Sequence, residues 1–187
     1  MRILAVSGSL QTGSTNAALL RVAGERVGAG VEVVRYDQLG EIPPFSPDID
    51  PAPAVIDRWR SLVRDTDALL IATPEYAHGL PGVLKNALDW LVGTGELYGK
   101  RVAILSAEPH AARAQHARAD LERTLRAQGA DVVGSETIAV PTGVRGHESD
   151  DAGVAAGVDR ALKALRAAVR AGTAGTSTSI GRTGRAG

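Results

Sequence analysis

Hydrophobic positions along the chain follow two different spacings that alternate. Short continuous apolar runs, typical of buried strands, occur at residues 2–8, 31–36, 67–74, 101–107 and 130–140. Between them apolar residues recur every three or four positions, as on one face of a helix, near 15–27, 54–64, 81–92, 111–128 and 154–169. The pattern therefore predicts strands and helices in regular alternation, with a Pro- and Asp-rich surface loop at 37–53.

This alternation predicts an α/β fold in which helices cover both faces of a parallel sheet. Right-handed crossovers leave few topologies, and we favour a flavodoxin-like three-layer sandwich with five strands in the order 2-1-3-4-5. Ligands of such sheets bind beyond the carboxyl ends of the strands, where strands 1 and 3 separate. The loops expected there are 7–16, SGSLQTGSTN, and 73–82, TPEYAHGLPG.

One compact domain accounts for the periodic part of the chain. A length of 187 residues is sufficient to bury a substantial core. Hydrophobic periodicity ends near residue 171, and the remaining GTAGTSTSIGRTGRAG has none. We therefore expect a domain over 1–171 and a disordered tail over 172–187.

Composition and charge exclude several classes of function. Lys plus Arg and Asp plus Glu number 21 each, so no basic excess points to nucleic acid or to an anionic membrane. The absence of cysteine excludes disulfides, thiol catalysis and cysteine-ligated metals. No apolar run approaches the roughly 20 residues of a membrane span, and residues 3–6 are too short for a signal-peptide core. We expect a soluble, cytoplasmic protein.

The first of the two loops has the features of a phosphate site. Gly8 and Gly13 have the spacing of a P-loop, but Ser14 occupies the position of its lysine. A loop that opens a helix presents free N–H groups and the positive end of the helix dipole to an anion. Neutral donors are available from Ser9, Ser14, Thr15 and Asn16. Such a loop can hold a monophosphate dianion, although a polar loop that only caps its helix has the same composition.

Other chemistries have weaker support in the residues. Glu75 follows the third strand, where a nucleotide hydrolase would place an acidic partner, but the P-loop lysine is missing. Ser106 ends a strand without the G-x-S-x-G elbow of a hydrolase. His110 and His116 are six residues apart, a poor spacing for helical metal ligands, so we expect no metal site.

The two loops together resemble the NADPH-dependent FMN reductase family, which includes flavin, quinone, chromate and azo-dye reductases. The first motif of that family resembles G-S-x-R-x-x-S-x-N, which is matched here by Gly8, Ser9, Ser14 and Asn16. The second resembles P-E-Y-N-x-x-x-P-G-x-L-K-N-x-x-D-W, which is matched by Pro74, Glu75, Tyr76, Pro81, Gly82, Leu84, Lys85, Asn86, Asp89 and Trp90. The likeness in strand order and spacing extends over about residues 1–170.

This resemblance implies a flavodoxin-like oxidoreductase that binds FMN noncovalently. Hydride would pass from NADPH or NADH to the flavin and on to a flavin, quinone or similar small acceptor. The flavin carries the redox chemistry, so no side chain is assigned a catalytic role. By resemblance, Ser9, Ser14, Asn16 and the backbone of Thr15 would contact the phosphate, and residues 74–76 would follow the isoalloxazine ring. The candidate cofactor-binding residues are Ser9, Gln11, Ser14, Thr15, Asn16, Pro74, Glu75, Tyr76, Ala77, His78, Gly79 and Ser106.

The chain departs from the family pattern at three places. Gln11 replaces the usual arginine and removes a charge-assisted phosphate contact, which is worth about 1.5–3 kcal/mol. Ala77 replaces the usual asparagine and is followed by His78, and the segment 106–115 lacks the expected glycine-rich loop. These changes leave open whether FMN is a retained group or a substrate, and which acceptor is used.

Two alternatives to a reductase remain at this stage: a flavodoxin-like electron carrier, and a relative that has lost its flavin. A formal charge of zero and only 3% aromatic residues favour the reductase over the carrier, which usually has an acidic surface. The apolar content of the helices near 80–92 and 111–128 predicts a homodimer or homotetramer. By resemblance, Trp90 would line such an interface; otherwise it is simply a partly buried side chain.

Overall fold

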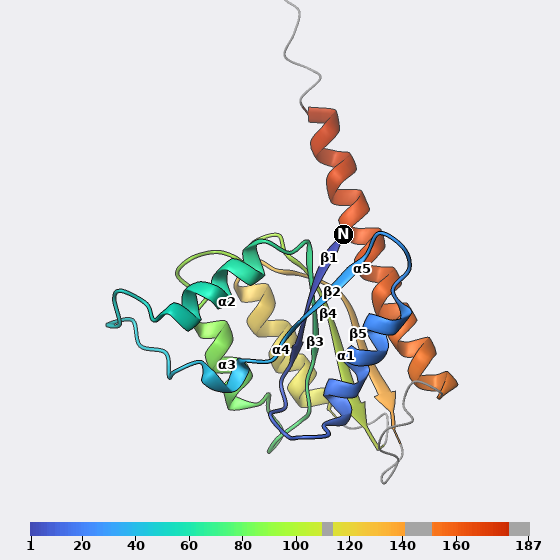
Figure 1. Cartoon of the computed structure of the whole chain (residues 1–187), viewed down its shortest axis with the longest axis horizontal. Coiled ribbons are helices and arrows are strands. Elements are labelled where there is room, and N and C mark those ends of the chain that lie inside the picture. Colours follow the sequence, from blue (N-terminus) through green and yellow to red (C-terminus); the bar gives the residue numbers. More distant parts are fainter. Residues whose placement is uncertain (110–113, 141–150, 180–187) are drawn as a thin grey trace, which may run out of the picture.

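The protein, described as a computed structural model over residues 1–109, 114–140 and 151–179, contains one parallel sheet of five strands in the order β2-β1-β3-β4-β5 (Figure 1). The strands are β1 Arg2–Ser7, β2 Glu32–Tyr36, β3 Ala68–Ala72, β4 Arg101–Glu108 and β5 Asp131–Ala139. The helices are α1 Thr15–Arg26, α2 Ala54–Arg64, α3 Gly82–Asp89, α4 Gln115–Ala127 and α5 Ala152–Ser179, with a short 3-10 turn η1 at Leu39–Glu41. The predicted sheet order and element sequence are confirmed.

Two hydrophobic cores lie on opposite faces of this sheet. Along β1, Leu4 and Val6 face the core covered by α2, α3 and α4, whereas Ile3 and Ala5 face the core covered by α1 and α5 (Figure 1). Both faces of the central strands are therefore buried, which explains why those strands are continuous apolar runs rather than alternating ones.

Trp59 of α2 is one of the two buried tryptophans of the first core. It is 1% exposed, its ring centroid lies 4.8 Å from that of Tyr36, and its indole N–H donates to the carbonyl of Ala87 at 2.9 Å. Its hydrogen bond satisfies the polar end of a buried ring, so the indole joins α2, α3 and β2 without leaving its N–H unpaired.

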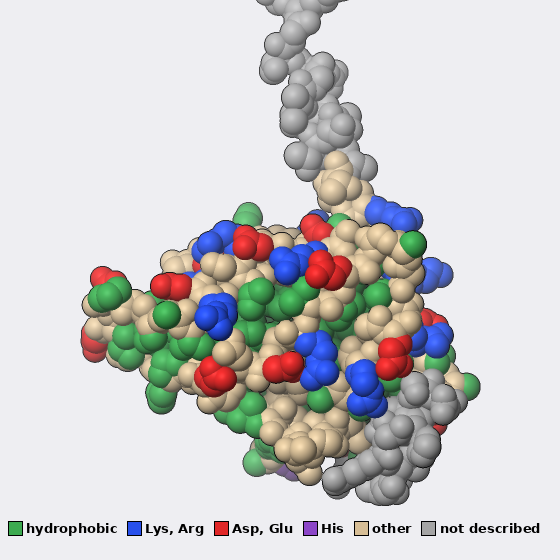
Figure 2. Space-filling view, viewed as in Figure 1, with side chains coloured by type: hydrophobic (Ala, Val, Ile, Leu, Met, Phe, Trp, Pro, Cys, Tyr) green, Lys and Arg blue, Asp and Glu red, His purple; other side chains and the backbone are tan. Residues whose placement is uncertain are grey.

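Helix α3 anchors the Pro-rich segment that precedes α2. The Asn86 amide donates to the Pro43 carbonyl at 2.9 Å and accepts from the backbone N–H of Phe45 at 2.8 Å, and the indole N–H of Trp90 also donates to Pro43 at 2.9 Å. Beyond this anchor the segment projects from the body, with green hydrophobic side chains on its surface (Figure 2). Phe45 in the anchor and Ile49 beyond it are both partly exposed. Because Asn86 and Trp90 are four residues apart, their side chains lie on the same side of the helix and both reach the Pro43 carbonyl.

Trp90 does not lie where the resemblance placed it. It is 2% exposed and held within the protomer by Pro43, Phe45 and Arg60. The expectation that Trp90 lines a dimer interface is therefore wrong, because its ring is buried against residues of its own chain and leaves almost no surface for a partner. Lys85 and Asp89, four residues apart on α3, form an ion pair at 2.6 Å.

Helix α5 continues to Ser179, eight residues past the predicted domain end at 171. Residues 172–179 were expected in a disordered tail, but here they extend a helix already packed on the sheet. Extending a formed helix costs far less than nucleating one, so weak local periodicity is not sufficient to end it. Residues 180–187, the rest of the expected tail, lie outside the described residues.

None of the helices in the described ranges is long and apolar enough to cross a bilayer.

Candidate functional site

The two loops singled out in the sequence meet at the carboxyl edge of the sheet, the lower edge in Figure 1. Because β1 and β3 are neighbours, the loop after each starts from the same place. The backbone N–H of Gly8 donates to the Ala72 carbonyl at 2.8 Å. A Cβ on Gly8 would lie 3.0 Å from Thr73 Oγ1 and 3.2 Å from a methyl of Leu84. Glycine at position 8 therefore allows the two loops to approach this closely.

The first loop ends as the N-cap of α1. The Ser14 hydroxyl accepts from the backbone N–H of Ala17 at 3.4 Å, and Gly13 has a φ of +74°, a conformation that favours glycine. The Ser9 hydroxyl accepts from the N–H of Gln11 at 3.3 Å, so these serines shape the loop as well as lining it.

Backbone donors of this loop are left without acceptors. Within the described part of the chain no protein acceptor is found for the N–H groups of Thr12, Gly13, Thr15 and Asn16. Thr15 and Asn16 are the first residues of α1, where N–H groups have no intrahelical partner and the helix dipole is positive. The loop therefore offers an anion a set of neutral donors with no lysine or arginine among them.

Asn16 and Ser106 have roles that the sequence did not reveal. Asn16 is 3% exposed, and its side-chain oxygen accepts from the backbone N–H of Ala107 at 3.0 Å, which ties α1 to the end of β4. Ser106 is fully buried, and its hydroxyl donates to the Thr73 carbonyl at 2.5 Å. We therefore assign Ser106 to positioning the second loop rather than to contact with a ligand. Of the Asn16 side chain, only the amide N–H₂ remains available to a ligand.

The second loop contains a tight turn at residues 76–79. Tyr76 and Gly79 exchange backbone hydrogen bonds of 3.0 and 2.9 Å, and the two residues between them have φ values of +49° and +60°. Two successive positive φ values define a type I′ turn, which favours asparagine or glycine at both central positions. The turn presents Tyr76, 53% exposed, at this edge.

Replacing Ala77 with asparagine is expected to stabilise the protein by about 0.5–1 kcal/mol, because alanine at positive φ carries a steric cost that asparagine tolerates better. Urea unfolding measures the difference. Ala77→Val provides the contrast, since a β-branched residue in this conformation should destabilise the fold. Equal stability of the asparagine and valine variants would show that the turn is not held in this conformation.

Glu75 joins this turn to the start of α4. Its carboxylate accepts from the backbone N–H groups of His116 at 2.9 Å and Ala117 at 3.1 Å, and lies 3.3 Å from His78 Nδ1. Partial burial raises the pKa of Glu75, but hydrogen bonds from Ala117, His116 and His78 lower it by more, so the net pKa is below the usual glutamate value. This interaction therefore stabilises the fold above the ordinary glutamate pKa and is lost as the pH falls through the lowered one.

The two histidines beside Glu75 form a pair that the sequence did not predict. The rings of His78 and His116 meet edge to face with centroids 4.9 Å apart. They are 38 positions apart in the chain, so only tertiary structure reveals the contact. His110, which the sequence analysis paired with His116, lies outside the described residues, as do 111–113 of the segment after β4.

The structure thus brings together most of the residues expected from the sequence. Residues 8–16 and 73–79 share one edge of the sheet, with Asn16, Thr73 and Ser106 linked beneath them. Gln11 is exposed at the outer side of the first loop. Over the described ranges, no group of three or more His, Asp or Glu side chains is arranged to hold a metal ion.

Comparison with known proteins gives consistent matches. The family model described as NADPH-dependent FMN reductase matches residues 1–145. An NAD(P)H-dependent FMN reductase of Pseudomonas aeruginosa is 39% identical over 129 residues, which is 67% of this chain and 69% of that protein. A quinone reductase of Escherichia coli K12 is 33% identical over 94 residues, and this match spans only half of that relative.

A solved structure agrees with the sequence matches. FerB, a flavoenzyme NAD(P)H:(acceptor) oxidoreductase from Paracoccus denitrificans, superposes with a TM-score of 0.65 at 26% identity, covering 91% of this chain and 93% of that one.

Proposed function

The chain belongs to the NADPH-dependent FMN reductase family, and we propose that it transfers hydride from NADPH or NADH to FMN and passes the electrons on to a flavin, quinone or similar small acceptor. At the site, one observation supports this proposal most directly. Backbone N–H groups without acceptors lie at the junction of β1 and α1, beside the end of β3.

The residues present fit the phosphate group of FMN. The free N–H groups of Thr12, Gly13, Thr15 and Asn16 and the hydroxyls of Ser9 and Ser14 would hold it, supported by the dipole of α1. The phosphate dianion accepts hydrogen bonds, so neutral N–H and hydroxyl donors at a helix N-terminus can bind it without a lysine or arginine. Exposed Gln11 adds no charge, so we expect FMN to be held less firmly than in a relative with arginine there.

The second loop would hold the flavin ring. The backbone N–H groups of Glu75, Ala77 and His78 have no protein acceptor in the described ranges, and they lie in the turn that presents Tyr76. Flavin supplies the hydride transfer when bound. This chain orients the ring through the 73–79 backbone, and Glu75 fixes that backbone to α4.

We further propose a homodimer or homotetramer in the cytoplasm. Exposed hydrophobic side chains at Val92 and Tyr98, which are 60% and 85% exposed, support assembly because large apolar groups gain by leaving water. The nicotinamide donor supports the cytoplasm, since that compartment supplies it.

An anaerobic visible spectrum of the protein with stoichiometric FMN tests the proposal. We expect a perturbed flavin band that bleaches on addition of NADPH or NADH, and the bleaching nucleotide identifies the donor. A bound band that neither nucleotide bleaches would favour an electron carrier. A spectrum identical to that of free FMN would contradict the proposed site.

A further inference from the structure

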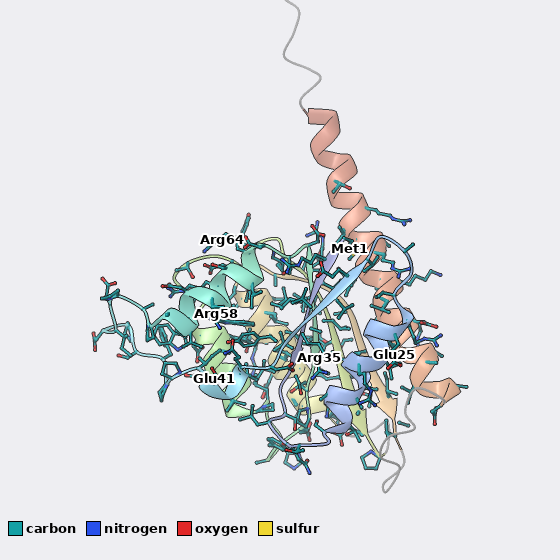
Figure 3. The ribbon with its side chains drawn as sticks, in the orientation of Figure 1. Met1, Glu25, Arg35, Glu41, Arg58 and Arg64 are labelled. Carbon is teal, nitrogen blue, oxygen red and sulfur yellow. The ribbon has the colours of Figure 1, made fainter. Side chains whose placement is uncertain are left out.

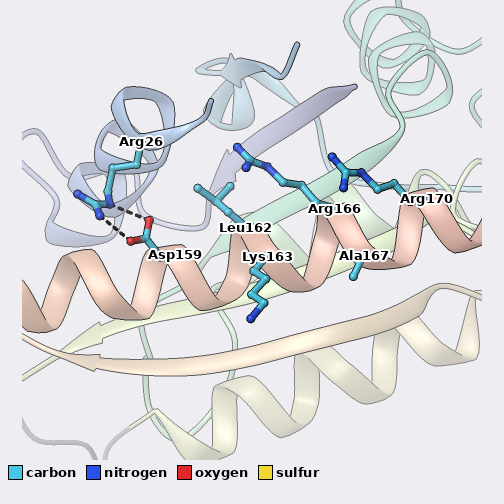
Figure 4. A pocket seen from close by; sticks show the side chains of 7 residues that line it. All are labelled: Arg26, Asp159, Leu162, Lys163, Arg166, Ala167 and Arg170. Atoms are coloured by element: carbon cyan, nitrogen blue, oxygen red, sulfur yellow. Dashed lines mark hydrogen bonds and ion pairs between the residues drawn. The ribbon is translucent and has the colours of Figure 1, made fainter. Parts of the chain in front are cut away.

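A groove lies between the end of α1 and the middle of α5, well away from the two loops (Figure 4). It has a volume of about 520 Å³ and is lined by Arg26, Asp159, Leu162, Lys163, Arg166, Ala167 and Arg170. Arg26 is the last residue of α1, whose first turn belongs to the phosphate loop, so the length of the helix, about 16 Å, separates the two places.

The only acidic side chain of this lining is already neutralised. Arg26 donates two hydrogen bonds to the Asp159 carboxylate, at 2.8 and 2.5 Å, which is the paired geometry of a strong guanidinium–carboxylate contact. These bonds, with a further contribution from Arg166, hold the pKa of Asp159 below its usual value. The carboxylate therefore stays charged but gives no net negative charge to the groove.

Three cations of the groove remain unbalanced. Within the described ranges, Lys163, Arg166 and Arg170 have no carboxylate within 4.0 Å, whereas Arg160, on the same helix, is paired with Glu136 at 3.0 Å. Arginines of the other helices, such as Arg64 and Arg126, also have acidic partners. A chain with equal numbers of acidic and basic residues has therefore gathered an excess positive charge at one place.

Helix electrostatics do not explain this charge. Residues 163–170 lie at least nine positions before the end of α5 at Ser179, and the helix dipole acts within the last turn. Moreover, the Nε atom of Arg166 is buried and has no hydrogen-bond partner. A buried guanidinium nitrogen without a partner is costly, and an anion in the groove would relieve that cost.

We propose that this groove binds a small organic anion with two negatively charged groups, of the diphosphate type. Arg166 and Arg170 extend side by side from α5 into it (Figure 4). Arg166 and Arg170 are one helical turn apart, about 6 Å along the helix axis, a spacing that suits two linked anionic groups such as those of a diphosphate better than one. Leu162 and Ala167 supply an apolar surface for the organic part, and the volume is that of a small-molecule site.

Isothermal titration with pyrophosphate tests the proposal, using FMN-saturated protein so that the phosphate loop is filled. We expect saturable binding that weakens at higher salt and is at least fivefold weaker in Arg166→Gln. Arg58→Gln is the matched control: Arg58 lies on α2, on the opposite side of the sheet (Figure 3), and its loss should leave the affinity unchanged. Inorganic phosphate should bind more weakly than pyrophosphate, because it engages fewer of the cations.

Three results would overturn the inference. These are no binding of pyrophosphate at millimolar concentration, equal weakening by Arg166→Gln and Arg58→Gln, and binding of anionic lipid vesicles without binding of pyrophosphate. Thermal unfolding of the Arg166→Gln protein confirms that it is folded. Since the test needs no electron transfer, its result is independent of the reductase reaction.

Discussion

Thr15→Pro is expected to weaken FMN binding by about 10- to 100-fold while leaving the fold intact. Thr15 is the first residue of α1, and its N–H has no protein acceptor in the described chain. Proline is well tolerated at this helix position, where it removes that N–H together with the threonine hydroxyl. Ser14, with φ −59° and ψ 129°, already has the conformation required before proline. A hydrogen bond to a charged group contributes about 1.5–3 kcal/mol, which sets the expected loss.

The affinity is measured by titrating the protein with FMN and following flavin fluorescence. Thr15→Ala, which keeps the N–H but loses the hydroxyl, should bind much more tightly than the proline variant. Circular dichroism and thermal unfolding check that the proline variant keeps α1. If a folded Thr15→Pro protein binds FMN with unchanged affinity, the phosphate does not lie at the start of α1.

Trp59→Ala is expected to lower the free energy of unfolding by about 3–5 kcal/mol. Trp59 is 1% exposed, packs on Tyr36, and donates to the Ala87 carbonyl. Its removal leaves a cavity in the core beneath α2 and α3. Since domains of this kind are stable by about 5–15 kcal/mol, the loss is a large share of the total.

Urea unfolding followed by circular dichroism measures this change. Trp59→Phe keeps most of the ring but not the N–H donor, so its loss should be smaller, roughly 1–3 kcal/mol. A cost below about 1 kcal/mol for Trp59→Ala would mean that the core closes over the missing ring, contrary to the packing described.

The fold was predictable because the evidence for it is local. Continuous apolar strands such as 68–72 and helices with one apolar face, such as 54–64, follow from burial on both sheet faces and on one helix face. Strand order then follows from the few topologies that right-handed crossovers allow. The end of α5 was less predictable, because a helix that has already formed can extend past its periodic stretch.

The candidate site was predictable only in part. Placing both loops at one edge followed from strand order. A cap at Ser14 or Thr15 agrees with the residue types, and the structure shows it at Ser14. The hydrogen bonds of the buried polar side chains could not be predicted, because their partners are far away in the sequence. Asn16 accepts from Ala107, and Ser106 donates to Thr73. Likewise, nothing local to Glu75 indicates that it accepts hydrogen bonds from the start of α4.

The division of the interior into two cores also separates the two halves of the site. The first loop continues into α1, which packs on one face of the sheet, and the second loop leads into α3, which packs on the other. Substitutions in the turn at 76–79 therefore leave the packing of α1 untouched. In evolutionary terms, a lineage with this architecture can vary the 76–79 turn while the helix that opens the proposed phosphate site keeps its packing.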